Sequence, residues 1–333
     1  MMAVSGRSPA TAHAVAFVAA HHESAEALGG ELVDLVNDPD AFAARLDAGL
    51  RALADPAYQA GQHSVAPGLG PVHGVRWPLL AAVSRTFRRG TRHDRPTPLL
   101  FVADRLLREP ILEMHWFAFG ILERTLDGEP ERTWQLMRRA AREAGDWITV
   151  DSLAHAYVAG VLSETYRWAE LEQLVYSADK WERRLVGATI ARLPFELPRQ
   201  RRAELANSPG LTLIKSLIGD SEPNVQKALS WALRSWNEVD EQGVGAVLRD
   251  EADSAARTDD GNRAWVVRDA LTWPGTDPRL VAEIRSILEG VHRRTGGKST
   301  SVAAAVAGAF TGLDRLSEQA VMMQGDRQRL AGR

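Results

Sequence analysis

The segment 145–157, GDWITVDSLAHAY, places an aromatic ring, a hydroxyl and a carboxylate just ahead of an apolar helical pattern. Trp147, Thr149 and Asp151 supply these groups. A carboxylate can stabilise developing positive charge or position a water molecule, and an indole face attracts cations. An Asp before an apolar helix is also a favoured N-cap, so the segment taken alone favours capping for Asp151. His155 follows one turn later, and a purely structural Asp–His pair is the simpler interpretation of that spacing.

Tryptophan is unusually frequent, with ten residues against four tyrosines. Buried packing is the default interpretation, because interfaces between helices need volume. Several indoles nonetheless adjoin polar or cationic residues, as Trp181 does before Arg183 and Trp231 does after Lys227. Indole faces that line a basic cleft would attract a cation or stack on a nucleotide. Tryptophans of the central part of the chain include Trp77, Trp116, Trp147, Trp181, Trp231 and Trp236.

The formal net charge of −3 argues against a protein that binds nucleic acid over its whole surface. Arginine is nevertheless clustered, since segment 76–95 contains Arg76, Arg88 and Arg89 among six arginines, with Asp94 as its only acidic residue. Such a cluster can neutralise phosphates in a salt-dependent way, whereas a solvated helix face explains any single cluster equally simply. Three further clusters are Arg138, Arg139 and Arg142; Lys180, Arg183 and Arg184; and Arg199, Arg201 and Arg202.

Composition excludes several kinds of site. The 333 residues include no cysteine, so disulfides and thiolate metal sites are ruled out. The nine histidines have no metal-ligand spacing, and no metal or organic cofactor is implied. GLGPVHG at 68–74 does not end in the Gly-Lys-Ser/Thr of a phosphate loop. The start lacks a secretory signal and the apolar run at 301–310 is too short to span a bilayer, so we expect a cytoplasmic, nucleoid-associated protein with no membrane contact.

Helical periodicity runs through the chain without a pattern of alternating strands, which predicts an all-α fold. We expect a loose N-terminus over 1–12 and one repeat domain over 13–290. Residues 291–333 are expected to form a linker, a possible helix to about Met323 and a loose tail. Breaks rich in Gly and Pro predict short turns near 55–71, 92–98, 127–131, 196–200, 219–224 and 273–278, and caps are expected at NDPDAF (37–42) and ADPAY (54–58).

Three segments resemble one another: 181–193, 224–236 and 262–273. Each begins polar, continues through small and aliphatic residues and ends in a bulky apolar group. A period near 40 residues is typical of HEAT-like solenoids, in which helix pairs stack into a superhelix with a concave face. Superposing the first two segments places Arg184 opposite Lys227, which predicts cations at the start of successive inner helices. The fold expected is therefore an all-α HEAT-like superhelix with a basic concave face.

The same residues resemble a known family. GDWITVDSLA is similar to the W-x-T/S-V-D motif of the AlkD-like DNA alkylation repair glycosylases, which are built from HEAT-like repeats. The chain departs from that motif at Ile148, where the family usually has an acidic residue. The resemblance covers roughly 70–275, and neither the first 70 residues nor the C-terminal tail is matched. Other matching segments are DKWERRLVGATIA (179–191), which resembles the next inner helix; NVQKALSWALRSW (224–236), which resembles the Q-K-A-x-x-W-x-L-R helix; and 74–89 and 108–124, which resemble early helices.

The resemblance implies a glycosylase that excises purines alkylated at N3 or N7 from duplex DNA, without deep base flipping. In this interpretation Asp151 stabilises charge on the deoxyribose, and Trp147 and Trp231 flank the lesion. The motif contains no lysine for a Schiff base, which favours a monofunctional enzyme. The expected partner is double-stranded DNA with alkylated purines, bound by a monomer. The predicted DNA contacts are Arg183 or Arg184 at the nearby phosphate, Lys227 and Arg234 further along, and Thr149, Arg76, Arg88 and Arg89.

Two other functions remain open from the sequence. A non-catalytic HEAT-like protein would bind DNA structure or a protein partner and would tolerate Asn in place of Asp151. A pure protein-interaction solenoid would have no DNA affinity, and its segment 76–95 would face away from the concave side or be balanced there by acidic residues. The repeat pattern and the family resemblance together favour a catalytic Asp151 over a simple cap.

Overall fold

The computed structural model describes residues 8–292 and 297–309. The chain divides into two compact units, 1–164 and 165–333, so the repeat domain predicted over 13–290 is shared between them. Helices form the regular structure of the described residues, apart from an isolated antiparallel bridge between Ala54 and Val75. The all-α class predicted from the sequence is confirmed.

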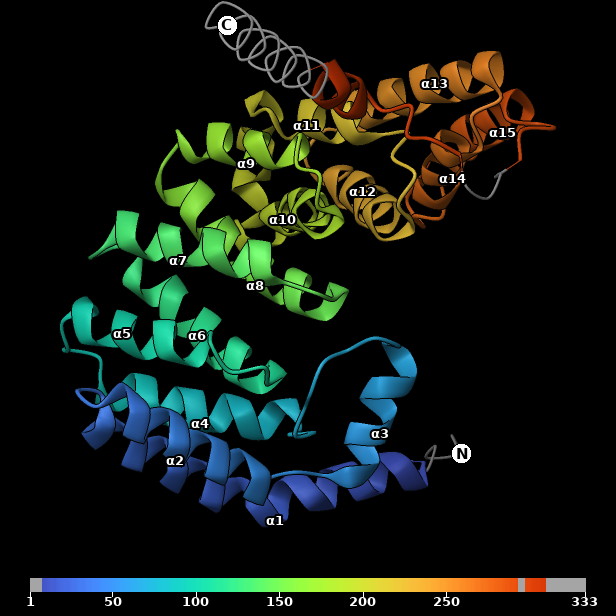
Figure 1. The fold of residues 1–333 in the computed structure, drawn as a ribbon. Helices are drawn as coiled ribbons and strands as arrows, with labels where there is room; N and C mark the ends of the chain where they lie inside the picture. The colour runs from blue at the N-terminus through green and yellow to red at the C-terminus, as the bar shows by residue number, and fades with distance from the viewer. Residues whose placement is uncertain (1–7, 293–296, 310–333) are drawn as a thin grey trace, which may run out of the picture. The chain divides into compact units, whose positions relative to one another are not determined.

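Unit 1 consists of two helical layers (Figure 1). Helices α1, α4, α6 and α8 lie side by side in the first layer, and α2, α5 and α7 pack against them as the second. The short helix η1 joins α1 to α2, and α3 lies in the connection from α2 to α4. The bounds are α1 Pro9–Glu31, η1 Leu32–Leu35, α2 Pro39–Ala52, α3 Pro56–Val65, α4 Trp77–Gly90, α5 Pro96–Leu106, α6 Leu112–Thr125, α7 Pro130–Glu143 and α8 Trp147–Ser163.

Most helices of unit 1 begin with a proline in the first turn, where its missing N–H costs no hydrogen bond. The caps predicted in NDPDAF and ADPAY are confirmed: Asp38 accepts the Ala41 N–H at 3.0 Å, and Asp55 accepts the Ala57 N–H at 3.0 Å. The second cap begins α3 inside the range 55–71 that was predicted to be a break. Likewise α1 begins at Pro9, within the segment expected to be loose.

The interior of unit 1 is built from aliphatic and aromatic side chains of both layers. Phe42 of α2, Phe87 of α4 and Phe117 of α6 form a cluster of three rings in mutual contact, with centroids 5.3 to 5.9 Å apart. All three rings are buried, and each contributes about 1.5–3 kcal/mol through removal from water. The packing fixes α4 and α6 relative to one another, and these two helices carry much of the candidate site.

Unit 2 repeats the two-layer plan. The three self-similar segments fall on α10, α12 and α14, which stack in one layer, so the internal repeat is confirmed as a structural one. Gly187 lets α10 approach α12 closely, because a Cβ there would lie 2.9 Å from the Cβ of Ala228. The bounds are α9 Arg167–Val175, α10 Lys180–Glu196, η2 Arg199–Asn207, α11 Gly210–Leu217, α12 Pro223–Trp236, α13 Glu241–Thr258, α14 Gly261–Ala270 and α15 Pro278–Ile287.

The segment that follows residue 296 lies on unit 2. The Thr300 N–H donates to the Gly219 carbonyl at 3.0 Å, and its hydroxyl donates to Asp260. Residues 302–309 are helical, whereas the rest of the helix predicted to reach Met323 lies outside the described residues. Among the helices that the structure describes, none has both the length and the apolar character needed to cross a membrane.

Candidate functional site

The start of α8 shows which carboxylate caps the helix. Asp146 is the N-cap: its Oδ1 accepts the backbone N–H groups of Ile148 and Thr149 at 2.8 Å and 2.9 Å. The capping role that the segment alone suggested for Asp151 is therefore wrong. Asp151 lies in the second turn, where four-residue spacing puts it on the same helix face as Trp147 and His155.

Ile148 has an apolar environment. It packs with Trp147 and Trp116 against a buried cluster formed by Ala66, Leu69, Val72 and Leu112. Three members of this cluster belong to the connection between α3 and α4, and the fourth begins α6. An acidic side chain at position 148 would desolvate against this surface. The departure from the family motif therefore has a local structural reason.

Glu113 holds the connection between α3 and α4 in place. Its fully buried carboxylate accepts the N–H groups of His73, Gly74 and Val75 at 3.1 Å, 2.8 Å and 3.1 Å. Gly74 has φ of 81°, and a Cβ there would lie 2.5 Å from the Cβ of Gln59. Glycine is thus required at this turn, which leads directly into the first residue of α4.

A pocket of about 540 Å³ opens on the first layer of unit 1, among α4, α6 and α8. Trp77 and Trp116 form one wall, edge to face, with centroids 6.0 Å apart and planes at 82°. Ser152 and His155 bring α8 into the lining one residue and one turn beyond Asp151. The other lining residues are Leu80, Ala81, Ser84, Arg85 and Arg88 of α4; Phe119, Gly120 and Glu123 of α6; and Ala156 of α8.

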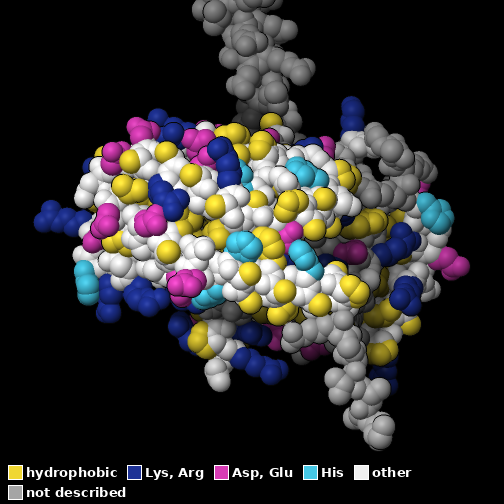
Figure 2. Space-filling view, turned by 90° about the horizontal axis from the view of Figure 1, so that it is seen from below, with side chains coloured by type: hydrophobic (Ala, Val, Ile, Leu, Met, Phe, Trp, Pro, Cys, Tyr) yellow, Lys and Arg dark blue, Asp and Glu magenta, His cyan; other side chains and the backbone are white. Residues whose placement is uncertain are grey.

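The rim of this pocket is basic along α4. Arg85, Arg88 and Arg89 are exposed, and none of them has an ion pair within the described residues. In the space-filling view from below, where α1 and α2 face the viewer, Lys and Arg side chains instead lie mainly toward the edges, with hydrophobic and histidine side chains between them (Figure 2). The exposed arginines of α4 therefore make this rim positively charged.

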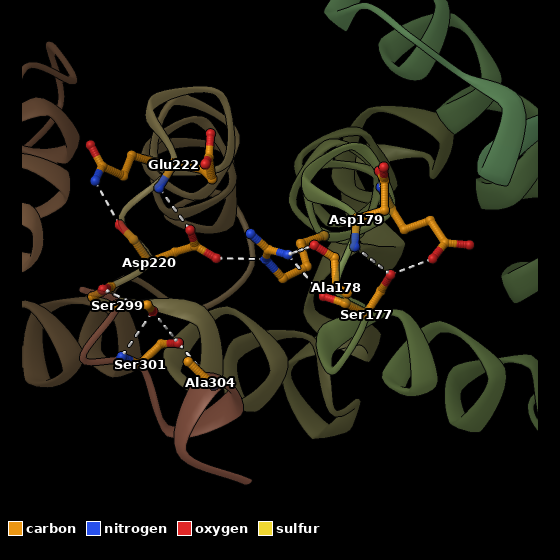
Figure 3. Close-up of polar contacts among 12 residues, drawn as sticks. Ser177, Ala178, Asp179, Asp220, Glu222, Ser299, Ser301 and Ala304 are labelled. Atoms are coloured by element: carbon orange, nitrogen blue, oxygen red, sulfur yellow. Dashed lines mark hydrogen bonds and ion pairs between the residues drawn. The ribbon is translucent and has the colours of Figure 1, made fainter. Parts of the chain in front are cut away.

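In unit 2, Arg183 is engaged by its own chain. Its Nε donates to Asp220 at 2.7 Å, and Nη1 donates to the carbonyls of Ser177 and Ala178 at 2.8 Å and 2.9 Å (Figure 3). Asp220 in turn accepts the Glu222 N–H at 2.8 Å. The guanidinium thus fixes the turn before α10 to the turn before α12. Arg183 could contact a phosphate only through the N–H donors that these bonds do not use.

Of the other DNA contacts predicted in unit 2, Arg184 and Arg234 form hydrogen bonds within the protein, whereas Lys227 is exposed. Arg184 is buried and donates to the Asn224 carbonyl at 2.6 Å, and Arg234 donates to Asp269 at 2.5 Å. Lys227, at the repeat position equivalent to Arg184, is exposed. The two cations therefore occupy equivalent positions near the start of α10 and α12, as the repeat predicts, but Arg184 is buried and Lys227 is exposed.

Trp231 of α12 is half-buried and lies under a cation from the neighbouring helix. The Arg192 guanidinium is 5.2 Å from its ring centroid. This pair resembles the arrangement expected of an indole in a basic environment. Nothing in the sequence motif singled out Arg192.

Two DNA contacts predicted in unit 1, Arg76 and Thr149, also form hydrogen bonds within the protein. Arg76 donates to Asp55 at 2.7 Å and stacks 5.1 Å from the Tyr58 centroid. Thr149 is buried, and its hydroxyl donates to Asp146 at 2.7 Å. These residues position the beginnings of α3, α4 and α8, and their DNA contacts remain predictions.

Sequence reasoning did not identify the pocket, although a signal was present. Trp77, Ala81 and Arg85 follow a four-residue spacing along α4, as do Ser84 and Arg88, so the helix combines an indole and two cations on one side. The contributions of α6 and α8 depend on tertiary packing and leave no such trace in the sequence.

The layered helix pairs, with self-similar segments on successive helices, define a HEAT-like helical-repeat protein. The family model of the DNA alkylation repair enzymes matches residues 46–273, and the chain belongs to this family. No curated protein and no solved structure shows a significant match to the chain. Membership agrees with the resemblance carried by the Trp147–Asp151 motif and gives the chain a role in DNA repair, with DNA as its substrate.

Proposed function

We propose that the protein is a DNA glycosylase that hydrolyses the N-glycosidic bond of purines alkylated at N3 or N7. The observation that carries the proposal is the face of α8 on which Trp147 and Asp151 lie, in a chain of the DNA alkylation repair family. Asp146 performs the capping, so helix geometry does not require the Asp151 carboxylate. An acidic group next to an indole can stabilise positive charge that develops on a bound sugar.

The reaction suits a carboxylate. An N3- or N7-alkylated purine is cationic and leaves as a neutral base, so the bonding electrons of the C1′–N bond go to the base and positive charge develops on the sugar. The Asp151 carboxylate would stabilise this charge and orient the attacking water, accepting its proton as oxygen bonds to C1′. Products are the free base and an abasic site in an intact strand.

Trp147, on the same face of α8 as Asp151, would attract the positive charge of the lesion nucleotide through its ring face, and the role that the family resemblance gives Trp231 stays a prediction. Trp147 is held by the cluster around Leu69, and Trp231 by the cation of Arg192. Both indoles are half-buried, which leaves part of each ring accessible. Because the lesion is already a good leaving group, neither deep flipping into a tight pocket nor a lysine nucleophile is needed.

The DNA backbone would be held mainly by Arg88, Arg89 and Lys227, which are exposed and have no ion pair among the described residues. Arg76, Arg183, Arg184 and Arg234 would act chiefly by fixing helix ends, and would offer a phosphate only their remaining donors. Binding should weaken steeply with salt, as it does when phosphates are neutralised by side-chain cations.

The experiment compares wild type with Asp151→Asn on duplex DNA that contains N7-methylguanine. We expect base release to fall by at least about 100-fold while duplex affinity is retained. Asp127→Asn, at an exposed turn between α6 and α7, is the matched control and should leave release unchanged. Absence of release by wild type on both small and bulky adducts would contradict the proposal.

A second candidate function is favoured by Ile148. Because the chain has an apolar residue where the family motif is usually acidic, a non-catalytic protein that binds distorted DNA is the alternative. It predicts DNA binding without base release, and no effect of Asp151→Asn on either. The same pair of measurements therefore separates the two functions.

A further inference from the structure

The pocket of unit 1 has a composition that catalysis by Asp151 does not explain. Trp77 is 61% exposed, although a large aromatic ring is normally covered. Phe119, only 5% exposed, lies deeper in the same pocket. An open indole above an apolar floor offers a flat surface on which another aromatic ring can stack.

Two arginines follow the exposed indole of Trp77 along the same helix. Arg85 and Arg88 follow Trp77 along α4 by eight and eleven residues, which corresponds to roughly 12 Å and 16 Å along the helix axis. Both arginines belong to the pocket lining, where Glu123 is the only acidic residue. The pocket therefore combines an aromatic stacking surface with a net positive rim.

We propose that this pocket binds an undamaged, unpaired nucleotide of DNA, with its base against Trp77 and the neighbouring phosphates on Arg85 and Arg88. Stacking on aromatic rings together with phosphate neutralisation is the general means by which proteins hold unpaired nucleotides. The volume of about 540 Å³ is in the range of small-molecule sites and holds one nucleotide rather than a duplex. Ser84 supplies a hydroxyl for the base edge, and Ser152, whose hydroxyl donates to the Ile148 carbonyl at 2.7 Å, keeps its oxygen as an acceptor.

A paired base cannot use this site, because its faces are covered by its neighbours in the stack. The proposal therefore concerns a nucleotide released by a disrupted base pair, and the lesion itself need not be flipped. It relies on DNA being the substrate of the family but not on glycosylase chemistry. Failure of base release would leave it standing.

The test measures affinity by fluorescence anisotropy for a perfect duplex and for the same duplex with a single-nucleotide bulge. We expect wild type to prefer the bulge about tenfold, and Trp77→Ala to abolish that preference while duplex affinity changes little. Trp77→Phe should keep most of the preference, because it retains a stacking ring. Phe101→Ala is the matched control: Phe101 is 62% exposed on α5 and lies outside the pocket.

A second variant tests the cations. Arg85→Ala with Arg88→Ala should weaken bulge binding and lower the salt slope by about two, one for each lost phosphate contact. Arg142→Ala, an exposed arginine of α7, should leave both unchanged. A urea transition measured for every variant identifies any loss of folding.

Three results would overturn the proposal. The first is equal affinity of wild type for the bulged and the perfect duplex. The second is a preference that survives Trp77→Ala in a folded protein. If free dAMP binds as tightly as the bulge, the pocket takes a mononucleotide instead, and the DNA assignment is wrong.

Discussion

Asp146 holds Thr149 by two hydrogen bonds at the start of α8: Oδ1 accepts its backbone N–H at 2.9 Å, and Oδ2 accepts its hydroxyl at 2.7 Å. The same Oδ1 also accepts the Ile148 N–H at 2.8 Å. One carboxylate therefore satisfies the first turn and orients the helix that carries Trp147 and Asp151. Capping and the proposed chemistry are assigned to different aspartates.

This division predicts opposite behaviour of the two aspartates. Asp146→Ala should lower the free energy of unfolding by about 1–2 kcal/mol, as expected for the loss of an N-cap, and leave base release by the folded protein largely intact. Asp151→Asn should lower release by at least about 100-fold in a protein that still folds. Urea unfolding and a release assay at saturating protein measure both. Asp146→Ser, which retains a capping oxygen, should recover most of the lost stability.

Ile148 offers a second test, because its side chain packs on the cluster of Ala66, Leu69, Val72 and Leu112. Ile148→Ala should destabilise unit 1 by about 2 kcal/mol through lost burial. Ile148→Glu, which restores the acidic character of the family motif, should be at least as destabilising here, since the carboxylate would meet an apolar surface. Hydrogen exchange of residues 66–75 should increase in both variants. An Ile148→Glu protein as stable as wild type would contradict the packing role.

The helical class, the repeat and the capped starts were predictable because they depend on local periodicity and on residues such as Asp38 and Pro39. The family was predictable from a short linear motif at α8. The pocket was not, since Trp116 and His155 reach it only through the packing of three helices. The hydrogen bonds that Arg183 and Thr149 form within the protein were not predictable either. A sequence shows that a side chain is cationic or polar, but not which neighbour it bonds.

Glu113 should be sensitive to a change that preserves its shape. Its two carboxylate oxygens accept three backbone N–H groups at the turn before α4, and the side chain is fully buried. Glu113→Gln replaces one acceptor with a donor, so at least one N–H loses its partner, and the free energy of unfolding should fall by about 1.5–3 kcal/mol. Glu109→Gln, on the half-buried surface nearby, should have a smaller effect. Urea unfolding at neutral pH measures the difference.

Asp55 should give unit 1 a specific acid sensitivity. Burial disfavours the charged carboxylate, but the hydrogen bond from Arg76, the N–H of Ala57 and the charge of Arg76 outweigh it and lower the pKa of Asp55 below its usual value of 3.8. A lowered pKa means that the unfolded chain binds the proton more readily. The stability that Asp55 contributes is thus fully present above about pH 5 and is lost as the pH falls through 3.8 toward the folded pKa.

Asp55→Asn should therefore reduce the free energy of unfolding by about 1–3 kcal/mol at pH 7, because Arg76 loses its charged partner. The deficit relative to wild type should shrink at pH 3, where the wild-type carboxylate itself becomes protonated on unfolding. Urea transitions at the two pH values measure it, with Asp127→Asn as an exposed control. A deficit that does not change with pH would show that the carboxylate charge is unimportant.

Gly187 tests the close approach of α10 and α12 in unit 2. Alanine is favoured over glycine inside a helix by about 1 kcal/mol, so propensity alone predicts that Gly187→Ala stabilises the protein. Its Cβ, however, would lie 2.9 Å from the Cβ and 3.0 Å from the backbone carbonyl carbon of Ala228, and neither atom can move without shifting α12. Overpacking of this kind costs about 1–3 kcal/mol, so the net effect should be destabilising. Gly245→Ala in α13 is the matched control: its Cβ meets only Leu280 at 3.5 Å and the flexible end of Arg249 at 3.7 Å, and it should stabilise unit 2. Urea midpoints that move in opposite directions for the two variants would confirm that helix contact, rather than propensity, selects glycine at position 187.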